Sequence, residues 1–124
     1  MDKKKILVVD DELFIRLLAK GALEKDYAIL EANDGEEAIA IARHQKPALI
    51  LMDIMMPKLD GIGACYILKS DIDTREIPVI MVSVRTDKLD QDYSRGMGAD
   101  DYLTKPFSVQ ALQDKVSQYE LTRC

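Results

Sequence analysis

The chain has 124 residues, the size of one ordinary domain and too short for two separate cores. Hydrophobic residues make up 48% and charged residues 31%, a balance that favours a packed domain and argues against a disordered chain or a membrane protein. The formal net charge of −5 opposes contact with phosphate backbones, and the short basic run at residues 3–5 does not offset it. We expect one domain over residues 1–124, with a core from about 5 to 119, that binds neither nucleic acid nor membranes directly.

Targeting signals and structural cysteines are not evident in the sequence. The first apolar run, residues 6–9, is much shorter than a signal-peptide core, and no run approaches the ~20 residues of a membrane span. Cys65 and Cys124 have neither metal-ligand spacing nor a disulfide framework. We therefore expect a cytoplasmic protein with two thiols of no assigned function.

Five short segments predict strands, and helical patterns lie between them. Short apolar runs bounded by turn residues are typical of strands that helices cover on both faces, as in parallel sheets. In chain order, the predicted strands are residues 6–9, 27–30, 49–53, 79–82 and 101–104. Their alternation with helices indicates βαβ units. The predicted fold is therefore α/β, a doubly wound, parallel, five-stranded sheet in the order 2-1-3-4-5.

Helix starts and apolar faces can also be read from the sequence. The first helix has an apolar stripe that we expect to pack on the sheet, formed by Phe14, Leu17, Leu18 and Ala22. Asp34 and Glu37 predict a capping box for the second helix, and Asp60 predicts a cap for the third. A fourth helix is predicted over residues 86–95, with few apolar positions, and a fifth begins at Ser108.

Acidic residues stand at the predicted carboxyl ends of two strands. Asp10 and Asp11 follow the first strand, and Asp53 ends the third. In the predicted strand order these two strands are neighbours at the switch point, where open α/β sheets bind ligands. Three carboxylates so close together would raise one another's pKa unless a cation lay between them. Oxygen ligands open to water suit a hard divalent ion such as Mg²⁺.

Two further side chains are predicted at the same edge of the sheet. Ser83 follows the fourth strand and Lys105 the fifth, which adds a hydroxyl group and an ammonium group. With a metal ion and a nucleophilic carboxylate, these groups could receive a phosphoryl group on Asp53. Considered singly, each residue has a simpler explanation. The acidic pair could cap a helix, Ser83 could lie in a turn, and Lys105 could be a solvated surface charge.

Taken together, these residues resemble the receiver domain of response regulators in two-component signalling, the CheY-like family. The motifs that carry the resemblance are Asp10-Asp11, Asp53-Ile54-Met55-Met56-Pro57, Asp60-Gly61, Ser83 and Lys105-Pro106-Phe107. The resemblance runs from Lys5 to about Tyr119 and implies a flavodoxin-like fold. It also implies that Mg²⁺ is held by Asp11, Asp53 and the backbone carbonyl of Met55, with Asp10 assisting through water.

The resemblance further implies a phosphorylation-controlled switch within a phosphorelay. A histidine kinase or a phosphotransfer protein would donate a phosphoryl group to Asp53, and the domain would dephosphorylate itself without being a conventional enzyme. Ser83 would move toward the phosphoryl group and Tyr102 would turn inward. The surface of helix four, strand five and helix five would then act on an output partner protein or a fused output domain.

Three positions depart from the commonest pattern of this family or vary within it. Val84 stands where the family usually has a very small residue, while Met55 and Arg85 occupy positions that tune hydrolysis in the family. The lifetime of the phosphorylated state is therefore open.

Two other functions are also considered. One is a phosphatase of the haloacid dehalogenase type, although Met55 stands where such enzymes need a second aspartate. The other is an interaction module in which phosphorylation is lost or used little.

Overall fold

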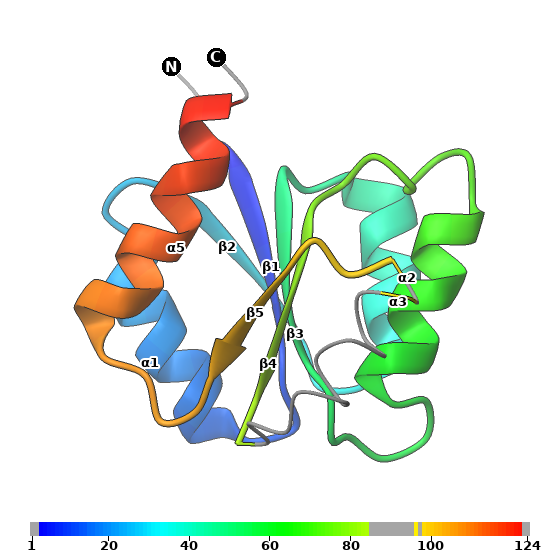
Figure 1. The fold of residues 1–124 in the computed structure, drawn as a ribbon, viewed down its shortest axis with the longest axis horizontal. Coiled ribbons are helices and arrows are strands. Elements are labelled where there is room, and N and C mark those ends of the chain that lie inside the picture. Colours follow the sequence, from blue (N-terminus) through cyan, green and yellow to red (C-terminus); the bar gives the residue numbers. More distant parts are fainter. Residues whose placement is uncertain (1–2, 85–95, 97, 123–124) are drawn as a thin grey trace.

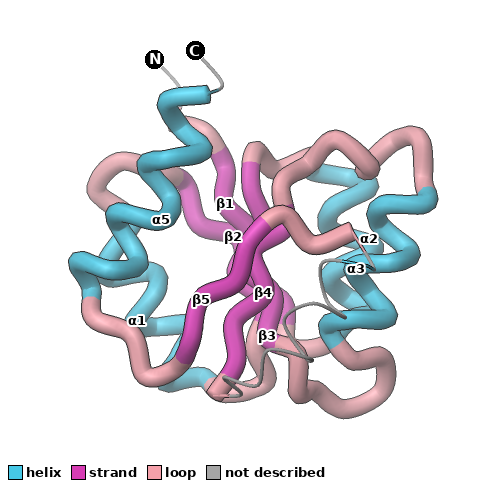
Figure 2. Tube along the Cα trace, in the orientation of Figure 1, coloured by secondary structure: helices cyan, strands magenta, loops and turns pink. Residues whose placement is uncertain are grey.

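The computed structural model describes residues 3–84, 96 and 98–122. Five strands form one parallel sheet in the order β2-β1-β3-β4-β5, as predicted (Figures 1 and 2). The strands are β1 (Lys5–Val9), β2 (Ala28–Ala32), β3 (Leu49–Asp53), β4 (Val79–Ser83) and β5 (Asp101–Thr104). Because all five run in the same direction, their carboxyl ends meet at one edge of the sheet.

Helices cover both faces of the sheet. In the part of the chain that the structure describes, they are α1 (Leu13–Leu23), α2 (Gly35–Gln45), α3 (Gly61–Ser70) and α5 (Val109–Thr122). Helices α1 and α5 lie on one face, and α2 and α3 lie on the other (Figure 1). The helix predicted over residues 86–95 lies outside the described residues. None of the described helices is both long enough and apolar enough to span a bilayer.

Alternate residues of each strand pack into two separate hydrophobic cores. One core, against α2 and α3, takes in Leu7, Val9, Ile50, Met52, Val79 and Met81. The other, against α1 and α5, takes in Ile6, Val8, Leu49, Leu51, Ile80 and Val82. This two-residue alternation is the period of a strand, and burial on both faces explains why the strand sequences are almost wholly apolar.

The predicted packing face of α1 was wrong in part. Phe14 is 71% exposed and Leu17 is 53% exposed, so these two residues do not pack on the sheet. The buried residues of α1 are Ala19, Ala22 and Leu23. Apolar residues lie almost all round this helix, so the sequence pattern alone does not fix its rotation. The small Ala19 and Ala22 allow the helix to lie close to the sheet.

Two of the predicted helix caps are confirmed. The Asp34 carboxylate accepts a hydrogen bond from the Glu37 amide at 2.8 Å, and the Asp60 carboxylate accepts one from the Gly63 amide at 2.8 Å. Helix α1 differs, because its N-cap residue, Glu12, makes no side-chain capping bond. Its acidic N-terminal turn is therefore held by other contacts, which are described below.

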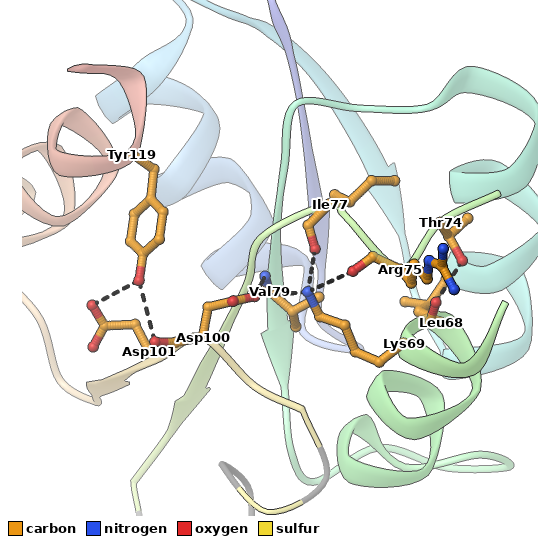
Figure 3. A network of polar contacts seen from close by, with 9 residues as sticks. All are labelled: Leu68, Lys69, Thr74, Arg75, Ile77, Val79, Asp100, Asp101 and Tyr119. Carbon is orange, nitrogen blue, oxygen red and sulfur yellow. Dashed lines mark hydrogen bonds and ion pairs between the residues drawn. The ribbon is translucent and has the colours of Figure 1, made fainter. Parts of the chain in front are cut away.

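A polar network joins the helix layers at the edge of the sheet opposite to the strands' carboxyl ends (Figure 3). The Lys69 ammonium donates hydrogen bonds to the carbonyl oxygens of Arg75 and Ile77 and pairs with the Asp100 carboxylate at 2.8 Å. The Tyr119 hydroxyl, on α5, lies 3.1 Å from the Asp101 carboxylate. Residues Asp100 and Asp101, at the start of β5, thus connect α3 with α5.

Candidate functional site

Three charged side chains meet at the carboxyl edge of the sheet. Asp10 follows β1, Asp53 is the last residue of β3, and Lys105 follows β5. The Lys105 Nζ atom lies 2.7 Å from Asp10 Oδ2 and 3.5 Å from Asp53 Oδ1. Asp10 and Asp53 are 2% and 4% exposed, so both carboxylates are held inside the fold. One lysine therefore bridges two buried carboxylates that lie far apart in the sequence.

Every polar group of Asp10 has a protein partner. Its backbone amide donates to the Ala32 carbonyl, and its backbone carbonyl accepts from Arg16 Nη1 at 2.7 Å. Its carboxylate accepts from the Glu12 amide through Oδ1 and from Lys105 through Oδ2. Such complete pairing offsets the free-energy cost of burying a charged residue. Asp10 thus anchors the turn that leads from β1 into α1.

The electrostatic environment of Asp53 raises the pKa of its carboxyl from 3.8 to about 6. Burial is the largest cause, and the negative charges of Asp10 and Asp11 add to it. The ammonium of Lys105 and the backbone amide of Met55, which donates to Asp53 Oδ1, act in the opposite direction. The ionised form of Asp53 is therefore destabilised in the folded protein unless more positive charge is supplied.

Lys105 remains a cation in these surroundings. Burial alone would lower the pKa of its ammonium, but the hydrogen bond that it donates to Asp10 and the charges of Asp53 and Asp10 outweigh burial and raise it. A lysine charged at neutral pH beside Asp53 can stabilise negative charge that develops on a group bound there.

Three carboxylates form an acidic group beside this pair. Oxygen atoms of Asp10, Asp11 and Glu12 lie within 4.8 Å of one another, and Asp11 and Glu12 are exposed. The donors are all carboxylate oxygens, and those of Asp11 and Glu12 are open to solvent, which suits Mg²⁺. The buried Asp53 carboxyl, whose pKa is raised by burial and by these acidic neighbours, would also be relieved by a divalent cation. The residues present thus fit a magnesium ion.

The sequence did not indicate a function for three residues near this site, which are Glu12, Arg16 and Gly61. Neither Glu12 nor Arg16 belongs to a motif that the sequence analysis used. Gly61 was quoted only as part of a motif. Its amide donates to the Ile54 carbonyl at 3.0 Å, and a Cβ atom at this position would overlap the carbonyl oxygen of Asp53. A contact this close between backbones explains why glycine follows Asp60, since any side chain would push the loop away from β3.

The other predicted site residues lie at or near the same edge. Ser83 is 1% exposed at the end of β4, and its carbonyl accepts from the Lys105 amide at 2.8 Å. Val84 is 66% exposed and Met55 is 59% exposed. Tyr102 is buried within β5 in the core that faces α2 and α3. Residues Arg85 and Cys124 lie outside the described residues.

A comparison with protein-family models matches residues 6–117 to the response regulator receiver domain. The match covers β1 to α5 and includes the acidic turn, Asp53, Ser83 and Lys105. The chain belongs to the response regulator receiver family. Receiver domains of this family act as phosphorylation switches in two-component signalling and interact with histidine kinases and output domains.

Relatives and solved structures agree with this assignment. The receiver is 44% identical over 117 residues to a probable transcriptional regulator, ycf27, of Cyanophora paradoxa, which covers 94% of this chain and 48% of that protein. The chain spans about half the length of these and other curated regulators that it matches.

Among solved structures, the chemotaxis protein CheY4 of Vibrio cholerae has a TM-score of 0.90 and 26% identity, with 94% of this chain and 98% of that chain covered. The receiver domain of the sensor histidine kinase PA1611 from Pseudomonas aeruginosa has a TM-score of 0.87 and 28% identity, with 94% and 97% covered. That structure holds a magnesium ion in its active-site cleft.

Proposed function

We propose that this receiver accepts a phosphoryl group on Asp53 and uses it to control a partner. The observation that carries the proposal is the buried Asp53 carboxylate, 3.5 Å from the Lys105 ammonium and next to the acidic group of Asp10, Asp11 and Glu12. A carboxylate nucleophile beside fixed positive charge is the arrangement that phosphoryl transfer to an aspartate needs.

The donor in this proposal is a phosphohistidine of a histidine kinase or of a phosphotransfer protein. A carboxylate oxygen of Asp53 attacks phosphorus, the bond from phosphorus to the imidazole nitrogen breaks, and its electron pair stays on the imidazole, which takes up a proton. Lys105 stabilises the negative charge on the transferred oxygens, and the Ser83 hydroxyl donates a hydrogen bond to one of them. Water later attacks the acyl phosphate and releases inorganic phosphate. The domain thus catalyses its own dephosphorylation and is not a conventional enzyme.

A magnesium ion belongs to this proposal. Asp11, Asp53 and the backbone carbonyl of Met55 would hold it, and Asp10 would assist through water. Glu12 is a further carboxylate near enough to take part. When bound, the ion would supply positive charge that neutralises the incoming phosphoryl group. Support comes from the all-oxygen donor set and from the magnesium ion in the related PA1611 receiver.

The output in this proposal is a change of surface. Ser83 moves toward the phosphoryl group, Tyr102 turns further inward, and the face formed by β5, α5 and the helix predicted over residues 86–95 changes for an output partner or a fused output domain. The position of Tyr102 supports this idea. Its side chain is buried in the core between the sheet and helices α2 and α3, so a shift of Tyr102 would change the packing of its neighbours. We place the reaction in the cytoplasm, where kinases have access to ATP.

Phosphorylation of Asp53 can be tested with a small-molecule phosphodonor and Mg²⁺. We expect the protein to gain the mass of one phosphoryl group, and Asp53→Asn to gain none, because an amide nitrogen is not a nucleophile here. Intact-protein mass spectrometry measures the label. Addition of EDTA should prevent labelling of the wild type.

Asp71→Asn is the matched control. It makes the same chemical change at a half-buried aspartate at the end of α3, where Asp71 pairs with Arg43. We expect it to be labelled as well as the wild type. A wild-type protein that takes up no label, or a label that survives Asp53→Asn, would refute the proposal.

A further inference from the structure

The Arg16 side chain contacts the acidic turn, residues 10–12, that leads from β1 into α1. Its guanidinium Nη1 donates to the backbone carbonyl of Asp10 at 2.7 Å, while its Nε donates to the Glu31 carboxylate at 3.1 Å. The Arg16 side chain is 16% exposed and that of Glu31 is 33% exposed, so these bonds are partly shielded from water. One side chain therefore joins α1, the end of β1 and strand β2.

The backbone of Arg16 forms part of the first turn of α1. Its amide donates to the Glu12 carbonyl at 3.2 Å in the first turn of α1. This backbone bond is the regular i to i−4 bond of the helix and does not depend on the side chain, so the contribution of the Arg16 side chain to the acidic turn is its bond to the Asp10 carbonyl. Asp11, an exposed carboxylate, lies between Asp10 and Glu12 in the chain.

The rest of α1 explains why such a contact is needed. Helices α2 and α3 are each fixed at their N-terminus by an aspartate side chain, whereas α1 begins at Glu12 with no side-chain cap. Uncapped helix ends fray, and this one carries the candidate metal-binding carboxylates. Glu31 matters as well, because its negative charge neutralises the guanidinium. Arg16 can then donate hydrogen bonds without acting as a competing cation beside the metal site.

From these contacts we propose that Arg16, neutralised by Glu31, is a positioning residue that sets the acidic turn for magnesium binding. This inference rests on the proposed function, since it concerns the same site. Arg16 does not touch the ion or the phosphoryl group; its side chain acts through the backbone carbonyl of Asp10. Outer contacts of this kind typically change metal affinity by about ten- to a hundredfold when they are removed.

The test is a Mg²⁺ titration followed by amide chemical shifts in NMR spectra. Arg16→Lys keeps the positive charge but lacks the planar fork that reaches two acceptors, so we expect about tenfold weaker Mg²⁺ binding. Arg16→Met removes the charge too. Electrostatics alone would then make Mg²⁺ bind more tightly, whereas loss of positioning makes it bind more weakly, and we expect the weaker binding.

Arg43→Lys is the matched control, because Arg43 also donates through Nε to a carboxylate, at Asp71, but far from the acidic turn. It should bind Mg²⁺ like the wild type. Thermal unfolding in EDTA verifies that each variant is folded, and if Arg16→Met is not, Arg16→Lys alone decides. Affinity within about twofold of the wild type in Arg16→Lys, or tighter binding in Arg16→Met, overturns the inference.

Phosphoryl labelling of the same proteins separates this inference from the proposed function. If the wild type binds Mg²⁺ in an Arg16-dependent way but takes no label on Asp53, only the proposed function fails. If the wild type is labelled and Arg16→Lys binds Mg²⁺ normally, only the inference about Arg16 fails.

Discussion

Asp53 shows at the scale of one residue how a reactive site conflicts with stability. Its carboxyl is buried, two carboxylates lie nearby, and Lys105, the cation that pairs with it among the described residues, is shared with Asp10. Lys105 lies closer to Asp10 than to Asp53, so Asp53 receives the smaller share of that positive charge. The negative charge of Asp53 in this environment is neutralised or stabilised when the carboxyl binds a proton, a divalent cation or a cation-bound phosphoryl group.

The raised pKa of Asp53 predicts a pH dependence of stability in EDTA. Since the pKa is about 6 in the folded protein and 3.8 in the reference state, the contribution of Asp53 to stability is fully present below pH 3.8 and is lost as the pH rises through 6. Asp53→Asn should therefore be more stable than the wild type at pH 7, by about 1–2 kcal/mol after allowance for solvent screening. Urea unfolding at several pH values measures the difference, which should vanish toward pH 4.

Asp71→Asn again serves as the control, because the pKa of Asp71 is shifted in the opposite direction to that of Asp53. Hydrogen bonds from the Asp73 amide and from Arg43 lower the pKa of Asp71. Neutralising that carboxylate should not stabilise the protein at pH 7. A wild type that is as stable as Asp53→Asn at pH 7 would contradict the destabilising environment described for Asp53.

Elements differ in how closely their backbones approach one another, and two glycines show the contrast. Gly21 lies in α1 with nothing within 4 Å of the place where a Cβ atom would be, whereas a Cβ atom on Gly61 would overlap the Asp53 carbonyl. The first glycine lowers the stability of its helix, and the second allows the start of α3 to lie against the end of β3.

The same substitution at these two positions should have opposite effects. We expect Gly21→Ala to stabilise the protein by about 0.5–1 kcal/mol, because alanine favours a helix and meets no neighbour. Gly61→Ala should cost about 2 kcal/mol or more, because the loop must move away from β3. Chemical denaturation measures both values, and equal effects at the two positions would show that the backbone contact at Gly61 is not tight.

The molecule as a whole is held together at both edges of its sheet by lysines. Lys105 bridges Asp10 and Asp53 at the carboxyl edge, and Lys69 connects the loop before β4 with the start of β5 at the other edge (Figure 3). The Asp100 carboxylate that pairs with Lys69 also accepts from the Val79 amide at 2.8 Å. The second network is distant from the site and has no chemistry of its own, so its contribution is to the fold.

Loss of the Lys69 network should destabilise the whole domain. We expect Lys69→Met to cost about 2 kcal/mol, because the carbonyl of Ile77 loses its donor at a partly buried position. The Asp100 carboxylate loses the ammonium as well and keeps the bond from the Val79 amide. Arg43→Met, which breaks an exposed pair, should cost at most about 0.5 kcal/mol. Thermal unfolding compares the two, and Mg²⁺ affinity should be unchanged in both. A cost for Lys69→Met no larger than for Arg43→Met would mean that water replaces the network.

The sequence alone determined the sheet, its strand order and the residues at its carboxyl edge. Strands buried on both faces must be apolar along their length, and residues 6–9 and 49–53 carry that pattern plainly. The caps at Asp34 and Asp60 could be predicted for a similar reason, since a helix start is fixed by residues close together in the chain.

Tertiary structure alone decided the rotation of α1, the pairing of Lys105 and the contacts of Arg16. Apolar residues surround α1, so the small Ala19 and Ala22 came to face the sheet and left Phe14 exposed. Lys105 lies closer to Asp10 than to Asp53, and Arg16 donates to a backbone carbonyl. A bond to a backbone carbonyl cannot be predicted from sequence, because every residue has that group. Local patterns record what each segment buries, whereas distances between segments depend on how all the layers pack at once.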